Sequence, residues 1–473
     1  MHKVFLCLLV AVIGTAAPAA DWPVWGGELH RNMVNHTEKG MPTKLAAKDN
    51  PELKWVAQLG SQSYGNPVIS DGKIFVGTNN QAELDPKIKG DKGVIMAFRE
   101  SDGAFLWQMV HDKLKAGRVN DWPLQGVCST PHVVGKRLYY VNNRCELICA
   151  DVEGLANGND GPYKNETYKG DKHGDIIWSY DMMEELGVFP HNLATSSPLV
   201  KDGLVFLVTG NGVDEGHLNL PSPISPSFIA VDAETGKLVW EYGELEKVLH
   251  GQWSSPAYAV IKGKPQVIFP GGDGWVYSLE PKSGKLIWKF DCNPKDSVWE
   301  LGGTGTRNNL ISTPVVHEDQ VIIGVGQDPE HGSGIGHFYA IDATKTGDIT
   351  KTGAKWHYGG KEFGRTMSTA SIHDGLIYIS ELDGILHAVD FKTGKQVWKH
   401  DLFAAVWGST MVVDGKIYIG DEDGDICILQ AGRTPKVLGE FNLGSAVYTT
   451  PSPANGVLYI ASRSKLFAFK AGK

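Results

Sequence analysis

Short apolar segments separated by tight polar turns recur along the whole chain. The clearest copy runs from Phe228 to Trp240, where an apolar strand, an acidic turn with Gly236 and a second strand ending on tryptophan follow one another. A unit that returns roughly every 40 to 70 residues predicts a repeat architecture with one continuous core. Similar phrases end at other tryptophans, namely Trp107, Trp178, Trp288, Trp356 and Trp398.

A two-strand hairpin precedes each of these phrases. Several hairpin turns carry an Asp-Gly pair, such as Asp202-Gly203 and Asp374-Gly375, which suits the positive φ that tight hairpins require. Eight sheets of four antiparallel strands can hide their faces by stacking around a ring, so we predict an all-β, eight-bladed β-propeller. The eight hairpins start near Tyr64, Val127, Ala194, Trp253, Leu310, Thr366, Gly408 and Val447.

The two ends of the repeat region complement each other. The last repeat stops three strands in, at Phe467 to Phe469, whereas the strand-like stretch Leu53 to Leu59 has no partner strands before it. Pairing the two would complete the last blade and remove an open sheet edge. The tryptophans of the outer strands, including Trp55, are expected to pack between neighbouring blades.

Three regions are predicted along the chain. Residues 1–20 have a short basic start, an apolar run and small residues around Ala19, which is typical of a secretory signal peptide. Residues 21–50 are interpreted as an N-terminal arm lying on the domain, and residues 51–473 as the propeller. We therefore expect an exported, soluble protein in the periplasm or outside the cell, with no transmembrane segment in the mature chain.

Charge and cysteine content narrow the function classes. The net charge of -9 and the absence of a Lys/Arg-rich run argue against a nucleic-acid partner. Five cysteines lie beyond the leader, without an adjacent pair or a C-x-x-C motif. This pattern argues against a disulfide framework, a zinc site and a c-type haem, and favours isolated buried thiols.

The longest connections fall on one face of the predicted ring, where propellers place their binding sites. In the connection 211–226, Asp214, Glu215 and His217 form a candidate metal-binding set, for which a solvated loop is the alternative. Aromatic, amide and basic side chains at the funnel rim suit a planar anionic ligand or a peptide. The rim set is Tyr64, Trp122, Gln125, His191, Asn192, Gln252, Trp253, Arg307, Asn308, Arg365, Trp407 and Tyr448.

The repeat A-x-D-x-x-T-G-x-x-x-W, seen at Ala230 to Trp240 and Ala388 to Trp398, resembles the repeat of the pyrroloquinoline-quinone (PQQ) propellers. Two branches of that family are relevant. Quinoprotein alcohol dehydrogenases hold PQQ and a calcium ion in the funnel. Exported non-catalytic propellers include a lipoprotein of the outer-membrane β-barrel assembly machine.

Each branch's pattern transfers in part. Thr209-Gly210-Asn211 looks like the dehydrogenase segment that carries an asparagine ligand to calcium, so the resemblance implies a metal role for Asn211. Gly271 stands where that branch has its catalytic aspartate, Asp273 falls on a turn position, and the adjacent-cysteine disulfide is missing. The only cysteine of the predicted leader, Cys7, lies inside the apolar run, so a lipid anchor like that of the assembly lipoprotein is not expected.

Three hypotheses follow. The first is an exported, monomeric, non-catalytic binding or scaffold module that takes a protein, peptide or carbohydrate partner on its loop-rich face. The alternative is a PQQ- and calcium-dependent dehydrogenase acting on alcohols or sugars. The third is a hydrolase or lyase that uses His191 as base. The candidate cofactor-binding residues are Trp253, Arg307, Arg365, Trp407, Gln125 and His191.

Overall fold

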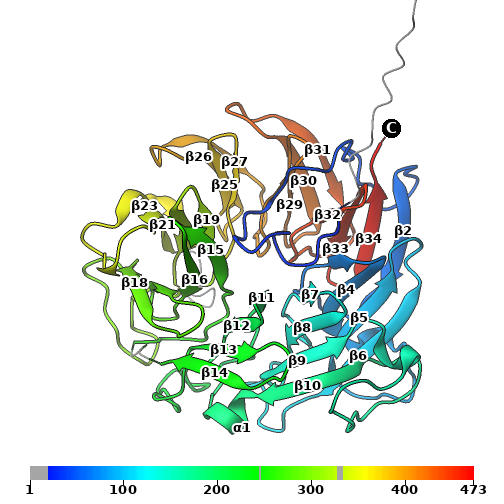
Figure 1. Cartoon of the computed structure of the whole chain (residues 1–473). Coiled ribbons are helices and arrows are strands. Elements are labelled where there is room, and N and C mark those ends of the chain that lie inside the picture. Colours follow the sequence, from blue (N-terminus) through cyan, green and yellow to red (C-terminus); the bar gives the residue numbers. More distant parts are fainter. Residues whose placement is uncertain (1–19, 244, 246, 328–333, 473) are drawn as a thin grey trace, which may run out of the picture.

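The computed structural model is a closed ring of eight antiparallel blades, as predicted (Figure 1). It describes residues 20–243, 245, 247–327 and 334–472, so the predicted signal peptide lies outside the described residues except for its last position. The described residues also include two short 3-10 helices, η1 (Asn80–Ala82) and η2 (Gly154–Asn157), each within a blade, and one short α-helix, α1 (Met182–Leu186), which connects the second blade to the third.

The first four blades follow the chain from the innermost strand outwards. They are β3 (Val68–Ser70), β4 (Lys73–Asn79), β5 (Lys92–Arg99) and β6 (Phe105–Asp112); β7 (His132–Val134), β8 (Arg137–Val141), β9 (Glu146–Asp151) and β10 (Asp175–Asp181); β11 (Leu199–Lys201), β12 (Leu204–Val208), β13 (Phe228–Asp232) and β14 (Leu238–Tyr242); and β15 (Ala257–Ile261), β16 (Lys264–Pro270), β17 (Trp275–Leu279) and β18 (Leu286–Asp291), to which β22 (Gly347–Asp348) adds a parallel edge.

The last four blades repeat this order, and the eighth borrows its outer strand from the start of the chain. They are β19 (Val315–His317), β20 (Gln320–Val325), β21 (Ile335–Asp342) and β23 (Ala354–Gly364); β24 (Ser371–His373), β25 (Leu376–Ser380), β26 (Ile385–Asp390) and β27 (Gln396–Asp401); β28 (Met411–Val413), β29 (Lys416–Gly420), β30 (Asp425–Gln430) and β31 (Val437–Asn442), with β1 (Val34–Asn35) added beside β28; and β32 (Ser452–Ala454), β33 (Val457–Ala461), β34 (Lys465–Lys470) and β2 (Leu53–Gln58).

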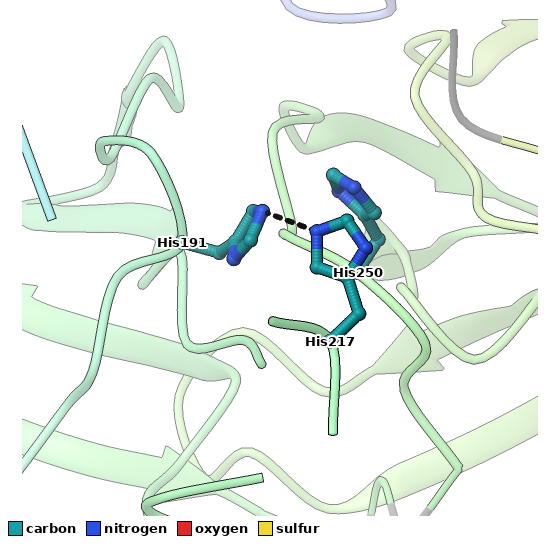
Figure 2. Close-up of side chains that lie close together, drawn as sticks. All are labelled: His191, His217 and His250. Atoms are coloured by element: carbon teal, nitrogen blue, oxygen red, sulfur yellow. Dashed lines mark hydrogen bonds between the residues drawn. The ribbon is translucent and has the colours of Figure 1, made fainter. Parts of the chain in front are cut away.

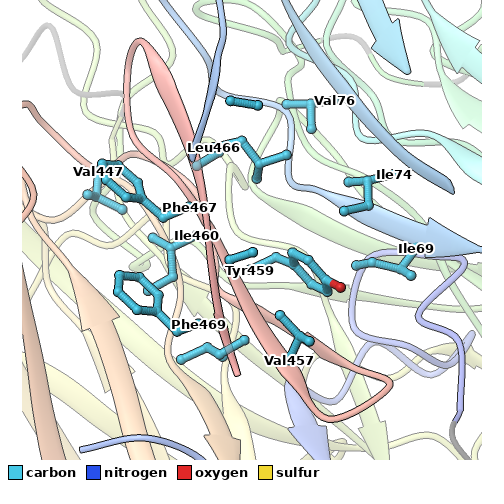
Figure 3. Close-up of a cluster of buried hydrophobic side chains, with 14 of the residues drawn as sticks. Ile69, Ile74, Val76, Val447, Val457, Tyr459, Ile460, Leu466, Phe467 and Phe469 are labelled. Carbon is cyan, nitrogen blue, oxygen red and sulfur yellow. The ribbon is translucent and has the colours of Figure 1, made fainter. Parts of the chain in front are cut away.

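The ring closes as the sequence predicts, because β2 pairs antiparallel with β34, with Val56 opposite Phe467. Period-two alternation gives the last blade two apolar faces. Figure 3 shows Tyr459 and Leu466 on the side of the first blade, with Ile460 and Phe467 on the opposite side. The closing blade is therefore held by burial against both neighbours as well as by strand pairing.

The outer-strand tryptophans pack between blades, as predicted. Trp356, for example, is mostly buried and its indole Nε1 donates to the carbonyl of Phe391 in the next blade at 2.8 Å. Trp288 differs, because it donates to Gln266 of its own blade, yet it packs in a cluster that includes Ile341 of the next. Five further indoles donate to a backbone carbonyl of the following blade at 2.8–3.1 Å, namely Trp55, Trp107, Trp178, Trp240 and Trp398.

The five described cysteines are all free thiols. Cys145, Cys149, Cys292 and Cys427 are buried, and Cys128 is partly buried. The sequence predicts isolated thiols buried in strands, which holds for Cys149 in β9 and Cys427 in β30, whereas Cys128, Cys145 and Cys292 lie outside the strands.

The N-terminal arm, dark blue in Figure 1, reaches every blade of the ring. Backbone or side-chain hydrogen bonds join it to the innermost strand of each blade, or to the residues just before that strand. The pairs are Trp22 with Ile69, Pro23 with Val133, Arg31 with Ser197, Leu29 with Tyr258, His30 with Val316, Asn32 with Ile372, Met33 with Val412 and Asn35 with Pro453. The arm thus lies across the ring axis and closes the channel at the end away from the long loops.

Arg31 is the most enclosed charged group of the arm, with no exposed surface. Its guanidinium donates to the carbonyl oxygens of Trp25, Pro256 and Ser197 at 3.0, 3.0 and 3.1 Å. Burial lowers its pKa to about 9, so the group still carries its proton at neutral pH. A forked donor of this kind satisfies several converging carbonyls that would otherwise be buried without partners.

We expect Arg31→Ala to destabilise the protein by about 3 kcal/mol, because it leaves several carbonyl oxygens buried and unpaired and opens a cavity. Scanning calorimetry should show a melting temperature several degrees lower. Arg99→Ala is the matched control, since Arg99 is exposed and pairs with Asp102 on the surface at 2.9 Å; exposed pairs contribute little. Equal melting temperatures for the two variants would contradict this role of Arg31.

Gly394 tests the tryptophan contacts. A Cβ at Gly394 would lie 2.5 Å from the Trp356 ring, whereas one at Gly375 would meet nothing within 4 Å, and both glycines have positive φ, +67° and +74°. Both alanine variants therefore pay a similar backbone strain of about 1 to 2 kcal/mol. We expect Gly394→Ala to lose about 1 to 3 kcal/mol more through overpacking. Calorimetry of both variants measures the difference, and its absence would show that the ring contact is loose.

Candidate functional site

A cavity of about 420 Å³ lies on the ring axis, on the side of the long loops. Its walls are the residues that lead into the innermost strands, and Trp25 of the arm contributes from below. The described lining is aromatic, apolar or neutral polar, with no Asp, Glu, Lys, Arg or His. It consists of Trp25, Tyr64, Asn66, Trp122, Gln125, Cys128, Thr130, Asn192, Leu193, Thr195, Ser197, Trp253, Ser255, Ile311, Thr313, Met367, Trp407, Gly408, Ser409, Tyr448 and Thr450.

Aromatic rings form one side of this cavity. Tyr64 and Tyr448 stack with centroids 4.9 Å apart and planes 5° from parallel, and Trp407 meets Tyr448 edge-on at 5.9 Å. Burial raises the pKa of Tyr64 far above its usual value, so its hydroxyl stays neutral. This wall offers flat apolar surface and neutral hydrogen-bonding groups.

Three lining residues carry a buried polar atom that has no hydrogen-bond partner among the described residues. They are the indole Nε1 of Trp25, the indole Nε1 of Trp407 and the hydroxyl of Thr313. Buried polar groups are normally paired. A ligand or ordered water in the cavity would supply partners to such groups, which makes them the natural anchors for polar atoms of a ligand.

The structure separates the predicted cofactor-binding residues into two groups. Gln125, Trp253 and Trp407 line the axial cavity. Arg307 and Arg365 are absent from its described lining. His191 lies behind Trp253, whose indole Nε1 donates to the His191 carbonyl at 3.0 Å.

Arg307 and Arg365 are engaged elsewhere. Arg307 Nη2 donates to the backbone carbonyl of Asp273 at 2.8 Å. Arg365 is 2% exposed, its backbone N–H donates to the Gly334 carbonyl at 3.1 Å, and its guanidinium packs against the Gly334 backbone. Both arginines thus hold loops in place around the rim.

Asn211 ties two of the long loops together. Its Oδ1 accepts from the backbone N–H of Phe189 at 2.9 Å, and its Nδ2 donates to the carbonyl of Ser222 at 2.9 Å. The backbone carbonyl of Asn211 accepts from Gln252 at 2.8 Å. Both side-chain atoms are used in these loop contacts, and the calcium role implied for Asn211 stays a prediction.

Three histidines from three different loops meet beside the cavity: His191, His217 and His250. The expected set of Asp214, Glu215 and His217 does not gather in this way. Asp214 accepts from the N–H groups of its own loop, and Glu215 pairs with Arg118 at 2.5 Å. The sequence shows three isolated histidines without motif spacing, so only the folded chain reveals the cluster.

The family model for the Outer membrane protein assembly factor BamB matches residues 162–400 and 336–434, which together make up more than half of the chain. The chain belongs to this family. The resemblance of its repeat to that of the PQQ propellers is therefore confirmed.

Relatives include both branches expected from the repeat. Quinoprotein alcohol dehydrogenase PedH of Pseudomonas putida is 28% identical over 468 residues, covering 92% of this chain and 69% of that protein. Polyvinylalcohol dehydrogenase of a Pseudomonas species is 22% identical over 517 residues, covering 93% and 73%. The crystal structure of BamB from Moraxella catarrhalis superimposes with a TM-score of 0.57 at 15% identity, covering 88% of this chain and 98% of that one, which shows the shared fold.

The described lining of the axial cavity in this BamB-family chain lacks the side chains that PQQ and calcium require. PQQ is a flat, anionic, carboxylate-bearing quinone, and carboxylates are normally held by Arg or Lys. Calcium takes oxygen ligands that usually include carboxylates. Within the described lining there is neither a basic nor an acidic side chain, so these residues do not fit the cofactor and its ion.

No helix within the described residues combines the length and the apolar character that crossing a bilayer requires.

Asp273 is a buried carboxyl whose backbone carbonyl accepts a hydrogen bond from Arg307. Burial raises its pKa to about 6, although the Tyr277 hydroxyl donates to it at 2.6 Å. The unfolded value is about 3.9, so the native state binds this proton more tightly. Its contribution to stability is therefore full below about pH 4 and is lost as the pH rises through about 6.

Asp273→Asn keeps an acceptor for Tyr277 and removes the titration. We expect the melting temperature of the wild type, relative to this variant, to fall between about pH 4 and pH 7. Thermal scans of both proteins across that range measure the difference. A difference that stays constant with pH would show that Asp273 titrates normally in the folded protein.

Proposed function

We propose that this protein is an exported, non-catalytic binding module whose axial cavity takes an uncharged, flat apolar group from a peptide segment of a partner protein. The observation that carries the proposal is the neutral aromatic lining of a cavity closed below by the arm and open on the loop-rich face. No residue is assigned a catalytic role in this proposal, and export rests on the predicted leader.

Size and chemistry both support such a ligand. Pockets for small ligands usually measure about 300 to 1,000 Å³ and combine apolar walls with a few polar anchors. The stacked pair Tyr64 and Tyr448 and the edge-on Trp407 present faces that favour another aromatic ring. Membership of a family described as an outer membrane protein assembly factor supports a protein as the source of that ring.

A PQQ- and calcium-dependent dehydrogenase is the second candidate. The match to quinoprotein alcohol dehydrogenase PedH over 92% of this chain favours it. The described lining opposes it, because Arg307 and Arg365 are absent from it and Asn211 is committed to loop contacts. The two candidates therefore predict opposite responses to the same set of probes.

Calorimetric titration of the mature protein separates them. The probes are a blocked Ala-Trp-Ala tripeptide, neutral maltotriose, and PQQ with and without calcium. We expect saturable binding of the tripeptide and none of PQQ. Binding of PQQ that requires calcium would overturn the proposal in favour of the dehydrogenase, and binding of maltotriose alone would reassign the cavity to carbohydrate.

Variants of Trp407 then locate the bound probe. Trp407→Ala should weaken tripeptide binding about tenfold, equivalent to about 1.4 kcal/mol, through loss of the ring contact. Trp407→Phe should retain most of the affinity. Trp275→Phe is the control, because Trp275 lies outside the cavity and contacts Lys289. Equal affinity in all three variants would place the tripeptide elsewhere.

A further inference from the structure

Three long loops bring histidine side chains to one point next to the axial cavity. His191 lies between α1 and β11, His217 between β12 and β13, and His250 between β14 and β15. Figure 2 shows the three rings turned toward one another. One nitrogen from each ring lies within 4.8 Å of the others, and the ring centroids are 4.4, 4.4 and 4.9 Å apart.

The spacing of two of these nitrogens matches a metal coordination shell. The Nε2 atoms of His191 and His217 are 3.3 Å apart. Two nitrogens bound to zinc at about 2.0 to 2.1 Å with tetrahedral geometry are about 3.3 Å from each other. The third nitrogen, on His250, lies within 4.8 Å of the other two.

The side chain of His191 is already oriented as a ligand. Its Nδ1 lies 2.8 Å from the carbonyl oxygen of Val213, which accepts the ring N–H and leaves the Nε2 lone pair facing the cluster. Metal-bound histidines usually have a second-shell acceptor of this kind. His191 is 2% exposed and His250 is fully buried, so two of the ligands are held within packed structure.

Backbone contacts hold the three loops together. A Cβ at Gly212 would lie 2.6 Å from the His250 carbonyl and 2.8 Å from the His191 Cβ, so only glycine permits this approach. His217 has a φ of 57°, which is uncommon outside glycine, and its carbonyl accepts from the Gly302 N–H at 2.7 Å. These backbone contacts thus hold the three loops, and with them the three imidazole rings, close together.

Three imidazoles select a particular class of ion. Nitrogen ligands suit zinc and the neighbouring first-row divalent metals, whereas calcium and magnesium require oxygen. The pair His337 and His357 provides a comparison within the chain, since their ring nitrogens are 3.0 Å apart but they belong to no cluster of three among the described residues. Among the described residues, a close histidine pair such as His337 and His357 therefore lacks the third nitrogen ligand that the cluster provides.

We propose that His191, His217 and His250 form a binding site for a divalent first-row transition metal, with zinc as the best-fitting ion. The described residues supply three of its ligands. The proposal is independent of what the axial cavity binds, because the ion can be titrated with the cavity empty.

The test uses untagged mature protein stripped of metal with a chelator and titrated with zinc chloride in a calorimeter. We expect one zinc ion per chain. Cobalt(II) in its place should give the intense visible absorption of a low-coordinate site. His217→Gln and His191→Gln should each weaken zinc binding on the order of 100-fold or more, exceeding the 10 to 100-fold typical of second-shell changes.

His357→Gln is the matched control and should bind zinc like the wild type. Zinc should also raise the melting temperature of the wild type and of His357→Gln but not of His217→Gln, which separates loss of the site from loss of folding. The proposal is overturned if zinc does not bind saturably below millimolar concentration. It is equally overturned if both cluster variants, folded by circular dichroism, bind zinc with unchanged affinity.

Discussion

The architecture depends on the hydrogen bonds between the N-terminal arm and the inner strands. Eight innermost strands point one edge toward the axis, where backbone groups need partners. The arm provides them blade by blade, and Arg31 joins the carbonyls of Trp25, Pro256 and Ser197 at the centre. A ring that would otherwise contain an open channel therefore contains a cavity with a closed end.

That closed end determines what the cavity can bind. Trp25 belongs to the arm and yet lines the cavity, so the arm supplies binding surface as well as stability. The charge of Arg31 is shielded by carbonyl oxygens, and the described lining stays neutral. Selectivity must then come from ring stacking and from a few neutral donors such as the Trp407 indole.

The fold was predictable because its determinants are local and repeated. An outer-strand tryptophan such as Trp356 and a turn glycine such as Gly394 recur from blade to blade, and the structure shows why, since the ring rests on the glycine of the next blade. The site was less predictable. Arg307 and Arg365 occupy the predicted positions in the sequence before the innermost strands, but their side chains contact other loops. The contact of His217 with His250 depends on loop packing, which residue spacing in the sequence does not reveal.

The long loops on one face of the ring form both the wall of the axial cavity and the histidine cluster. Trp253 belongs to both the cavity wall and the surroundings of the histidine cluster. It lines the cavity, its ring centroid lies 4.9 Å from that of His250, and its indole N–H donates to the His191 carbonyl. Gly251 makes this possible, because a Cβ there would lie 2.4 Å from the indole. The loops around the third blade thus position the cavity wall and the histidine cluster through one shared side chain.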